Sequence, residues 1–176
     1  PSKYIFLGPK GKKLAREIKN ADVFYYTGIS AGILDAKQKK DLIHIGSTAV
    51  TGGFDFNYRT QLHNDKKASQ LLFIEISKNI DINFISFDDV EELFNLKNPY
   101  EVFEILNDKK NLILIRYKDS IIFKNKQEVI KTVKVHHGEV VDTTAAGDAF
   151  NGSLLALINN DKNIPIVENI LKSHSV

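Results

Sequence analysis

Short apolar runs and amphipathic segments alternate along the 176 residues of this chain. Runs of β-branched and aromatic residues predict buried strands at 22–26, 81–87 and 111–116. Apolar residues at helical spacing predict helices at 37–45, 63–77, 88–94, 100–106, 148–158 and 167–173. Strands that alternate with helices in this way are typical of an α/β domain with a mainly parallel central sheet.

Shorter segments complete the pattern. Gly52-Gly53 predicts a break in the chain before a short strand end at 54–57. Residues 120–124 and 128–135 predict a pair of antiparallel strands, and residues 12–20 a surface helix. Ligands of parallel sheets bind beyond the carboxyl ends of the strands, so the residues that follow each strand are the first candidates for a site.

Composition excludes several classes of function. The chain has 24 Lys and Arg against 22 Asp and Glu, and its net charge of +2 argues against a dedicated nucleic-acid binder. The absence of Cys excludes a thiol nucleophile and Cys-ligated zinc, and it fits a reducing cytoplasm. No apolar run approaches the roughly 18 residues that suggest a membrane span. We therefore predict a cytoplasmic globular protein without a membrane or nucleic-acid partner.

The segment 140–152 (VVDTTAAGDAFNG) carries the most chemical information. Ala145, Ala146 and Gly147 form a turn of small residues before a predicted helix, where backbone N–H groups and the helix dipole can bind an anion. Asp148 lies at the mouth of this turn and could accept a hydroxyl proton while the donors hold a phosphoryl group. The spacing alone slightly favours a structural interpretation, in which Thr144 caps the helix and Asp148 complements its dipole.

The sequence Asp142-Thr-Thr-Ala-Ala-Gly-Asp148, followed by Ala-Phe-x-Gly, resembles the C-terminal signature of the PfkB/ribokinase family of sugar kinases. The usual family form is D-T-T-G-A-G-D, and the variant with Ala145 resembles the 2-keto-3-deoxygluconate kinase branch. The resemblance implies a ribokinase-like three-layer α/β/α fold, an anion hole made by the small-residue turn, and Asp148 as the general base. It also implies that Asp142 and Thr144 help to bind a monovalent cation such as K⁺, as in some members.

A second resemblance lies at Phe54-Asp-Phe-Asn-Tyr-Arg59, which is similar to the F-D-x-N-Y-R segment of the same branch. A guanidinium can bind a carboxylate or a phosphate through two parallel hydrogen bonds. Arg59, with Tyr58 beside it, is therefore a candidate to bind the acid group of a sugar acid or the γ-phosphate. Asn57 is a candidate to donate to the nucleotide phosphates. The alternative is an exposed Arg59 that packs over Tyr58.

Three weaker similarities concern other strand ends. Gly28, in the sequence G-I-S, resembles a turn near the sugar pocket of the branch. Asp89, at the end of S-F-D-D, falls where the wider family has an N-x-x-E motif that supports Mg²⁺, although a surface helix start explains it about as well. Arg116 and Lys118 lie where relatives carry a nucleotide-binding loop, which lacks one of its glycines here. Adenine nucleotide is expected to pass near this loop.

The resemblance implies a kinase that uses ATP and Mg²⁺ to phosphorylate the terminal hydroxyl of 2-keto-3-deoxygluconate, a sugar acid. The alternatives are a kinase of the same family for a neutral sugar such as fructose or ribose, and a non-catalytic homologue that binds nucleotide. A nucleic-acid module based on the basic residues 1–20 is a more distant alternative. Since relatives often dimerise, we expect a homo-oligomer, a dimer or higher.

The chain is expected to be one ribokinase-like core over residues 1–176, incomplete at both ends. It would lack the N-terminal lid and part of the sugar pocket that family members have, and the last part of their C-terminal nucleotide-binding region. It has no Met and begins at Pro1. We therefore expect it to be a piece of a longer protein, or a sequence that has lost residues.

Overall fold

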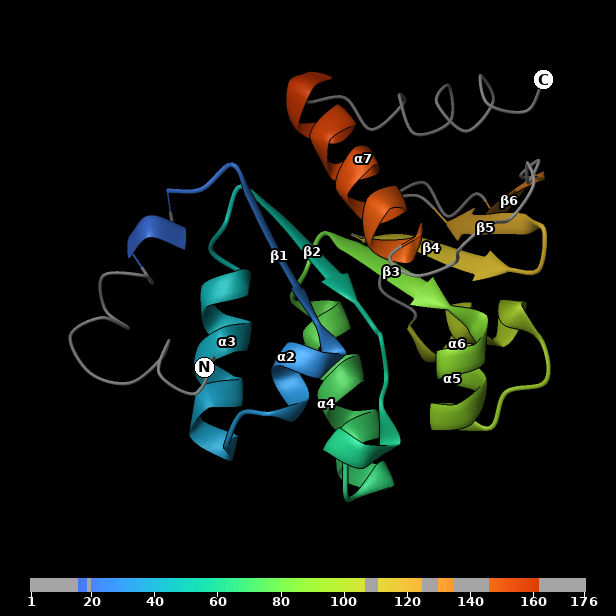
Figure 1. Cartoon of the computed structure of the whole chain (residues 1–176), viewed down its shortest axis with the longest axis horizontal. Coiled ribbons are helices and arrows are strands. Elements are labelled where there is room, and N and C mark those ends of the chain that lie inside the picture. The colour runs from blue at the N-terminus through green and yellow to red at the C-terminus, as the bar shows by residue number, and fades with distance from the viewer. Residues whose placement is uncertain (1–15, 19, 107–110, 125–129, 135–145, 162–176) are drawn as a thin grey trace.

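A single mixed β-sheet organises the protein (Figure 1). The computed structural model describes residues 16–18, 20–106, 111–124, 130–134 and 146–161. Within them the sheet has six strands: β1 (Val23–Thr27), β2 (Thr51–Asp55), β3 (Ile82–Ser86), β4 (Leu112–Tyr117), β5 (Ser120–Lys124) and β6 (Ile130–Lys134). The strands lie in sequence order; β1 to β4 are parallel, whereas β5 and β6 are antiparallel.

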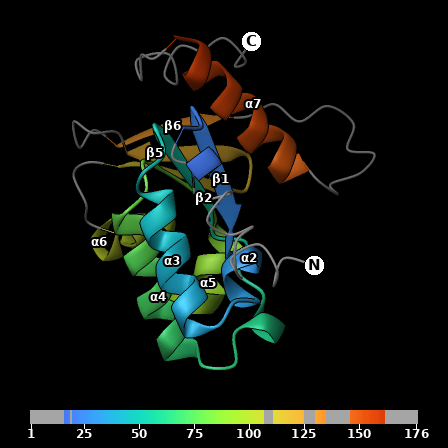
Figure 2. The same cartoon turned by 90° about the vertical axis from the view of Figure 1, so that its left-hand side faces the viewer.

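Helices cover both faces of the sheet (Figures 1 and 2). The helical segments are α2 (Gly28–Gly32), α3 (Ala36–Gly46), η2 (Thr60–Leu62), α4 (Lys66–Lys78), α5 (Phe87–Phe94), η3 (Pro99–Glu101), α6 (Val102–Ile105) and α7 (Ala146–Asp161). Parallel strands added in one direction with right-handed crossovers place their helices on one face, which is where α3 to α6 lie. α7 covers the opposite face, and the result is the predicted three-layer α/β/α arrangement.

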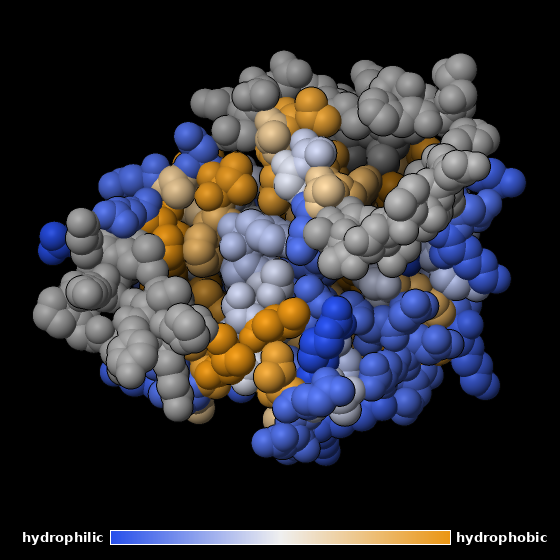
Figure 3. All heavy atoms as spheres, viewed as in Figure 1, coloured by the Kyte–Doolittle hydropathy of each residue, from blue (hydrophilic) through white to orange (hydrophobic). Residues whose placement is uncertain are grey.

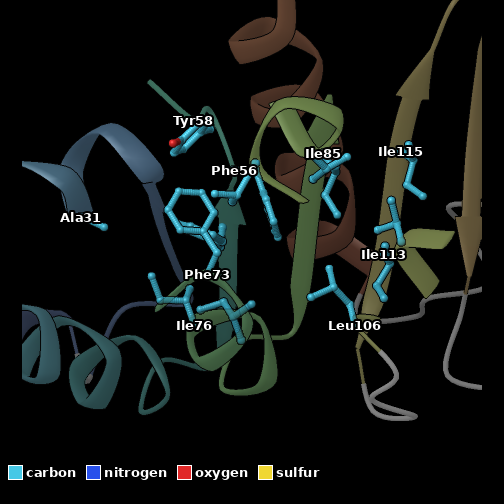
Figure 4. Packing of buried hydrophobic residues seen from close by; sticks show 14 of the residues in the cluster. Ala31, Phe56, Tyr58, Phe73, Ile76, Ile85, Leu106, Ile113 and Ile115 are labelled. Carbon is cyan, nitrogen blue, oxygen red and sulfur yellow. The ribbon is translucent and has the colours of Figure 1, made fainter. Parts of the chain in front are cut away.

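Alternating apolar positions supply a core on each face. In β4, Leu112 and Leu114 pack in the cluster that includes Leu154 and Leu155 of α7. The intervening Ile113 and Ile115 face the other side, in the larger cluster that Figure 4 shows in part. Complete burial of such a side chain contributes roughly 1.5–3 kcal/mol, so the two-sided pattern of β4 fixes a central strand.

Polar caps begin two of the crossover helices. Asp35 accepts a hydrogen bond from the Gln38 backbone N–H at 2.9 Å, and the Gln38 side chain accepts one from the Asp35 N–H at 3.0 Å. This reciprocal capping box starts α3. Asp65 caps α4 in a similar way, accepting from the Ala68 N–H at 3.0 Å. Both helices therefore begin at a carboxylate that stabilises otherwise unpaired N–H groups.

The two glycines that predicted a break in the chain are strand residues instead. β2 begins at Thr51 and runs through Gly52 and Gly53, which pair in register with β1. A Cβ atom at Gly52 would overlap Ile80 Cδ1, and one at Gly53 would lie 3.4 Å from Leu155 Cδ2. The prediction was wrong because these glycines make room for neighbouring side chains on both faces of the strand.

The remaining strand and helix predictions agree with the structure to within a few residues. The differences lie at the ends: α4 begins at Lys66 rather than at 63, and the 100–106 segment divides into η3 and α6. The helix predicted at 12–20 is described at 16–18, where it is helical, and at 20, which is a turn. The helix predicted at 167–173 lies outside the described residues. None of the described helices is long and apolar enough to cross a membrane.

Short helix α2 adds apolar surface beside the strand ends. It follows β1 directly; Ile29 within it and Ile33 just after it are exposed. The face seen in Figure 3 carries apolar side chains in this region. The carboxyl edge of the sheet is therefore flanked by an apolar surface on the β1 side.

Candidate functional site

Polar side chains gather where the parallel strands end. Because β1 to β4 run in the same direction, their carboxyl ends share one edge of the sheet. Asp55 is the last residue of β2, and Arg116 precedes the last residue of β4. The first turn of α7 lies against Arg116, which donates from Nη1 to the Gly147 carbonyl at 3.3 Å. This edge therefore brings together residues more than 90 positions apart in the chain.

A buried hydrogen-bonded group lies under α7. Asn151, which is fully buried, donates from Nδ2 to Asp55 Oδ2 at 2.8 Å and to the Tyr25 hydroxyl at 3.0 Å. The Tyr25 hydroxyl donates in turn to Asp55 Oδ2 at 3.3 Å. Burial raises the pKa of Asp55, and the Arg116 guanidinium opposes that rise. The three side chains join β1, β2 and α7 through polar contacts inside the protein.

Arg116 connects this buried group to the start of α7. Its Nη1 also donates to Asn151 Oδ1 at 3.1 Å, and its Nη2 lies 3.8 Å from Asp55 Oδ1. A Cβ atom at Gly147 would lie 3.0 Å from Arg116 Nη1, closer than side chains normally approach. Gly147 therefore lets the guanidinium lie flat against the first turn. The sequence predicted Arg116 near nucleotide and Gly147 in an anion hole, and the structure places the two in contact.

Asp148 lies in the first turn of α7 and is exposed. Burial raises the pKa of Tyr25, and the nearby carboxylates Asp55 and Asp148 raise it further. Asp148 is thus close enough to the buried group to act on it electrostatically. Among the other residues of the predicted turn, Ala146 is the first residue of α7. Ala145, Asp142 and Thr144 lie outside the described residues.

A second charged pair lies at the same edge, between the loop after β2 and α5. Arg59 is half exposed; its Nη1 donates to the Tyr58 carbonyl at 2.7 Å and to Asp89 Oδ1 at 3.3 Å. Asp89 is largely buried, with 16% of its side chain exposed. Burial raises the pKa of Asp89 to about 6, although Arg59 opposes the rise. Asp89 therefore ionises reluctantly for a carboxylate, and a cation brought to this edge would favour its charged form.

The unusual pKa of Asp89 has a measurable effect on stability. Its pKa is higher in the folded state than in the unfolded chain, so the stabilisation from its proton is present below about pH 4 and is lost as the pH rises through about 6. We expect Asp89→Asn to raise the free energy of unfolding at about pH 7.5 by roughly 1–3 kcal/mol, and to change it little at about pH 4. Thermal unfolding at both pH values measures this.

Asp88→Asn is the matched control, since Asp88 is exposed in the same first turn of α5. It is expected to change the unfolding temperature little at either pH. An equal effect of Asp89→Asn at both pH values would contradict the assignment of the raised pKa to Asp89.

Two of the predicted binding residues are packed in the core. Tyr58 is 2% exposed, and its ring packs against those of His63 and Phe73; Figure 4 shows Tyr58 and Phe73 in the core. Gly28 is buried at the start of α2, where a Cβ atom would overlap the Phe56 carbonyl oxygen. The Tyr58 backbone, rather than its ring, borders the charged pair, because its carbonyl accepts from Arg59. Both residues position the edge, and their predicted contacts with substrate stay predictions.

The other two predicted nucleotide-binding residues have left-handed backbone conformations. Asn57, with φ 31°, ends the extended segment after β2, and Lys118, with φ 53°, turns the chain between β4 and β5. Asn often adopts this conformation, whereas Lys rarely does. The Lys118 ammonium lies 4.9 Å from the centre of the Tyr117 ring. Both residues follow carboxyl ends of parallel strands, as predicted; their contact with nucleotide remains a prediction.

Sequence reasoning missed the buried partners Tyr25, Asp55 and Asn151. One signal was available: Asp55 and Asn151 are polar at positions where the strand and helix patterns require a buried side chain. A buried polar residue needs a partner, so each of them was a candidate for a network. Their pairing could not be deduced, because they are 96 residues apart.

Acidic and histidine side chains do not form a ready-made metal site in the part of the chain that the structure describes. There, no group of three or more His, Cys, Asp or Glu is placed to hold an ion. Asp89 is a carboxylate at the carboxyl edge that could contribute one ligand. Mg²⁺ in kinase sites is held by one or two carboxylates together with substrate phosphates, so this donor set fits a metal that arrives with a nucleotide.

The fold and the polar edge are those of α/β proteins that bind ligands at the carboxyl ends of parallel strands. Within that class, the chain belongs to the pfkB family of carbohydrate kinases, whose family profile matches residues 5–166. The predicted family is therefore confirmed.

Several curated relatives are named 2-dehydro-3-deoxygluconokinase. The chain is 28% identical over 173 residues to 2-dehydro-3-deoxygluconokinase of Haemophilus influenzae, covering 94% of this chain and 55% of that protein. It is 29% identical over 153 residues to the protein of the same name from Escherichia coli, covering 82% of this chain and 50% of that one. The chain thus spans about half the length of the curated relatives it matches.

A solved structure with the same fold is aminoimidazole riboside kinase from Salmonella enterica, complexed with aminoimidazole riboside and an ATP analogue. Its TM-score is 0.72 at 18% sequence identity, with 88% of this chain and 54% of that chain covered. A likeness at this identity concerns the fold alone. It confirms the predicted ribokinase-like α/β class.

Proposed function

We propose that the protein is an ATP-dependent kinase that phosphorylates the terminal hydroxyl of 2-keto-3-deoxygluconate. The observation that carries this proposal is the position of exposed Asp148, in the first turn of a helix whose start is held at the carboxyl edge by Arg116. The name shared by the curated relatives supports the sugar acid as substrate. The family includes kinases for other sugars, so the acid group is the feature to test.

The reaction needs a base, an anion site and charge neutralisation. Asp148 accepts the proton of the substrate's primary hydroxyl as that oxygen attacks the γ-phosphorus of ATP. The bond between the γ-phosphorus and the bridging oxygen breaks, and ADP leaves with the electron pair. The backbone N–H groups at the start of α7 and the helix dipole stabilise the negative charge on the transferred group.

Arg59 is the group proposed to bind the substrate's carboxylate. Its guanidinium is half exposed and has one carboxylate partner, Asp89, at 3.3 Å from a single nitrogen. Because the Arg59 side chain is half exposed, the pair contributes little stability, so an incoming carboxylate can bind Arg59 in place of Asp89 or beside it at little cost. A two-pronged contact with Arg59 then orients the sugar acid. A neutral sugar offers no such contact.

ATP and Mg²⁺ are the proposed cofactors. Arg116 and Lys118 carry positive charge at the edge where the phosphates would lie, and Asp89 would share Mg²⁺ with those phosphates. The metal neutralises charge on the β- and γ-phosphates when it is bound. A K⁺ site at Asp142 and Thr144 stays a prediction, which activity measured with K⁺ replaced by Na⁺ can test. Self-association into a dimer or higher oligomer also stays a prediction, which light scattering can test.

Removing the charge of Arg59 should separate the sugar acid from neutral sugars. We expect Arg59→Gln to lower kcat/KM for 2-keto-3-deoxygluconate by about 10–100-fold, mainly through KM, because a charged hydrogen bond contributes about 1.5–3 kcal/mol. Arg59→Lys keeps the charge without the planar guanidinium, so its kcat/KM should lie between those of wild type and Arg59→Gln. Steady-state kinetics measures all three proteins. An unchanged KM in Arg59→Gln would exclude Arg59 as the carboxylate ligand.

Release of ADP tests the proposed function itself. The full-length protein is assayed with Mg-ATP and, in turn, 2-keto-3-deoxygluconate, fructose and ribose. Turnover confined to the sugar acid supports the proposal. Turnover on a neutral sugar would keep Asp148 as base but overturn the choice of substrate, and ATP binding without turnover on any sugar would favour a non-catalytic nucleotide-binding homologue.

A further inference from the structure

The buried polar group beneath α7 has no direct part in the proposed chemistry. Asp55, Asn151 and Tyr25 contact one another, and Asn151 is fully enclosed. Buried polar groups cost stability unless their hydrogen bonds are made. A carboxylate, an amide and a phenol in contact therefore need an explanation beyond packing, for which apolar side chains would serve as well or better.

Among the described residues, these polar contacts join the helix to the sheet at the N-terminal end of α7. Asn151 binds Tyr25 of β1 and Asp55 of β2, and Arg116 of β4 binds both Asn151 and the Gly147 carbonyl. Further along α7, apolar residues provide the described contacts with the sheet: Leu154, Leu155 and Ile158. Apolar contacts allow a helix to rotate or slide slightly, whereas hydrogen bonds have strict distances and angles. The N-terminal end of α7 is thus the end whose position is defined.

The charges of Asp55 and Arg116 compensate each other. Asp55 is 2% exposed, and its Oδ1 has no hydrogen bond among the described residues. That oxygen faces the Arg116 guanidinium, with Nη2 3.8 Å away. Removing the negative charge of Asp55 would leave Arg116 without its buried counter-ion. The guanidinium would then turn to solvent and release the Gly147 carbonyl.

We propose that Asp55, Asn151 and Arg116 are positioning residues that hold the first turn of α7, and with it Asp148, at a fixed distance from the carboxyl edge. The effect on turnover rests on the proposed kinase function, whereas the effect on α7 does not. A base displaced by about 1 Å can lose about 100-fold in rate, so a helix start held by three strands serves the proposed transfer directly.

A pair of reciprocal substitutions tests this arrangement. Asp55→Asn removes the counter-ion of Arg116. Asn151→Asp removes the amide that donates to Asp55 at 2.8 Å and places a second carboxylate beside that of Asp55. The double variant Asp55→Asn/Asn151→Asp exchanges the two groups. The amide at position 55 can then donate to the carboxylate at position 151, which still faces Arg116. The hydrogen bond between positions 55 and 151 is restored with its direction reversed, while Arg116 still donates to position 151.

The first measurement is hydrogen–deuterium exchange of the amides at 149–151 in the full-length protein, which needs no substrate. These are the first amides of α7 that can bond to a carbonyl four residues earlier. Exchange is expected to be about tenfold faster or more in each single variant and to return to within about threefold of wild type in the double variant. The second measurement is kcat with 2-keto-3-deoxygluconate, which should fall about 10–100-fold in each single variant and recover in the double, with KM for ATP little changed.

Substitutions at two glycines of α7 test the proposal even if the Asp55 and Asn151 variants do not fold. Gly147→Ala places a Cβ atom 3.0 Å from Arg116 Nη1, whereas Gly152→Ala, in the same helix, meets nothing within 4 Å. Faster exchange at 149–151 is expected in Gly147→Ala, and slower exchange in Gly152→Ala, because Ala favours a helix over Gly.

Slower exchange in both glycine variants would overturn the proposal, as would a double variant no better than the two single variants. Exchange that follows the predicted order in a protein without kinase activity would support the positioning of α7 and refute the proposed function. The two claims therefore fail separately.

Discussion

Asp148→Asn is expected to lower kcat for the sugar acid by about 10²–10⁴-fold while leaving the KM for both substrates within a few fold. Asn has the shape of Asp but cannot accept the proton of the attacking hydroxyl. Asp148 is exposed in the first turn of α7, so the substitution removes no packing contact and at most a small interaction with the helix dipole. Steady-state ADP release and single-turnover assays measure the loss.

The matched control is Asp88→Asn, an exposed carboxylate in the first turn of α5, which should keep wild-type turnover. Thermal unfolding should show that Asp148→Asn is folded. An Asp148→Asn protein with normal kcat would refute the proposed base. A large loss in Asp88→Asn would show that any acid at a helix start on this edge has the same effect.

Gly28→Ala is expected to destabilise the protein by about 3 kcal/mol, which for a domain of this size lowers the unfolding temperature by roughly 6–12 °C. The added Cβ atom would overlap the Phe56 carbonyl oxygen and lie 2.7 Å from Phe73 Cζ. The oxygen belongs to the backbone, so relief requires a shift of the segment that leads to Arg59. Thermal and urea unfolding measure the change.

Gly152→Ala again provides the comparison, because nothing lies within 4 Å of the added atom. It is expected to stabilise α7 by about 0.5–1 kcal/mol through helix propensity. If Gly28→Ala were as stable as wild type, the close approach of α2 to the residues after β2 would be wrong. In that case, the predicted role of Gly28 near the sugar pocket would explain the glycine better than packing does.

Local patterns were sufficient for most of the fold. Strands such as 111–116 and helices such as 88–94 were predicted from apolar periodicity, and α5 and β4 lie there. β2 was predicted poorly because its Gly52 and Gly53 are usually turn residues. A side chain at Gly52 would overlap Ile80, and Gly53 lies close to Tyr25 and Leu155; these residues approach from elsewhere in the chain. A contact of that kind leaves no local signal.

The residues of the site likewise fall into those with a local signal in the sequence and those without one. Asp148, Arg59 and Asp89 lie in short motifs that resemble a known family, so each could be named from the sequence. Tyr25 and Asn151 are 126 residues apart and hydrogen-bond in the folded protein. Neither residue type is rare, and only the packing of α7 against the sheet brings the two side chains together. The residues of the motifs were thus predictable, whereas the residues that position them were not.

The most direct test of the central claim is proton-coupled phosphorus NMR of the product formed by the full-length protein from Mg-ATP and 2-keto-3-deoxygluconate. Transfer to the terminal hydroxyl places the phosphorus beside one CH₂ group. The predicted result is a new phosphate monoester signal split into a triplet, formed in equal amount with ADP. ADP formed with inorganic phosphate and without the ester signal, or ATP that stays intact, would contradict the proposed phosphoryl transfer.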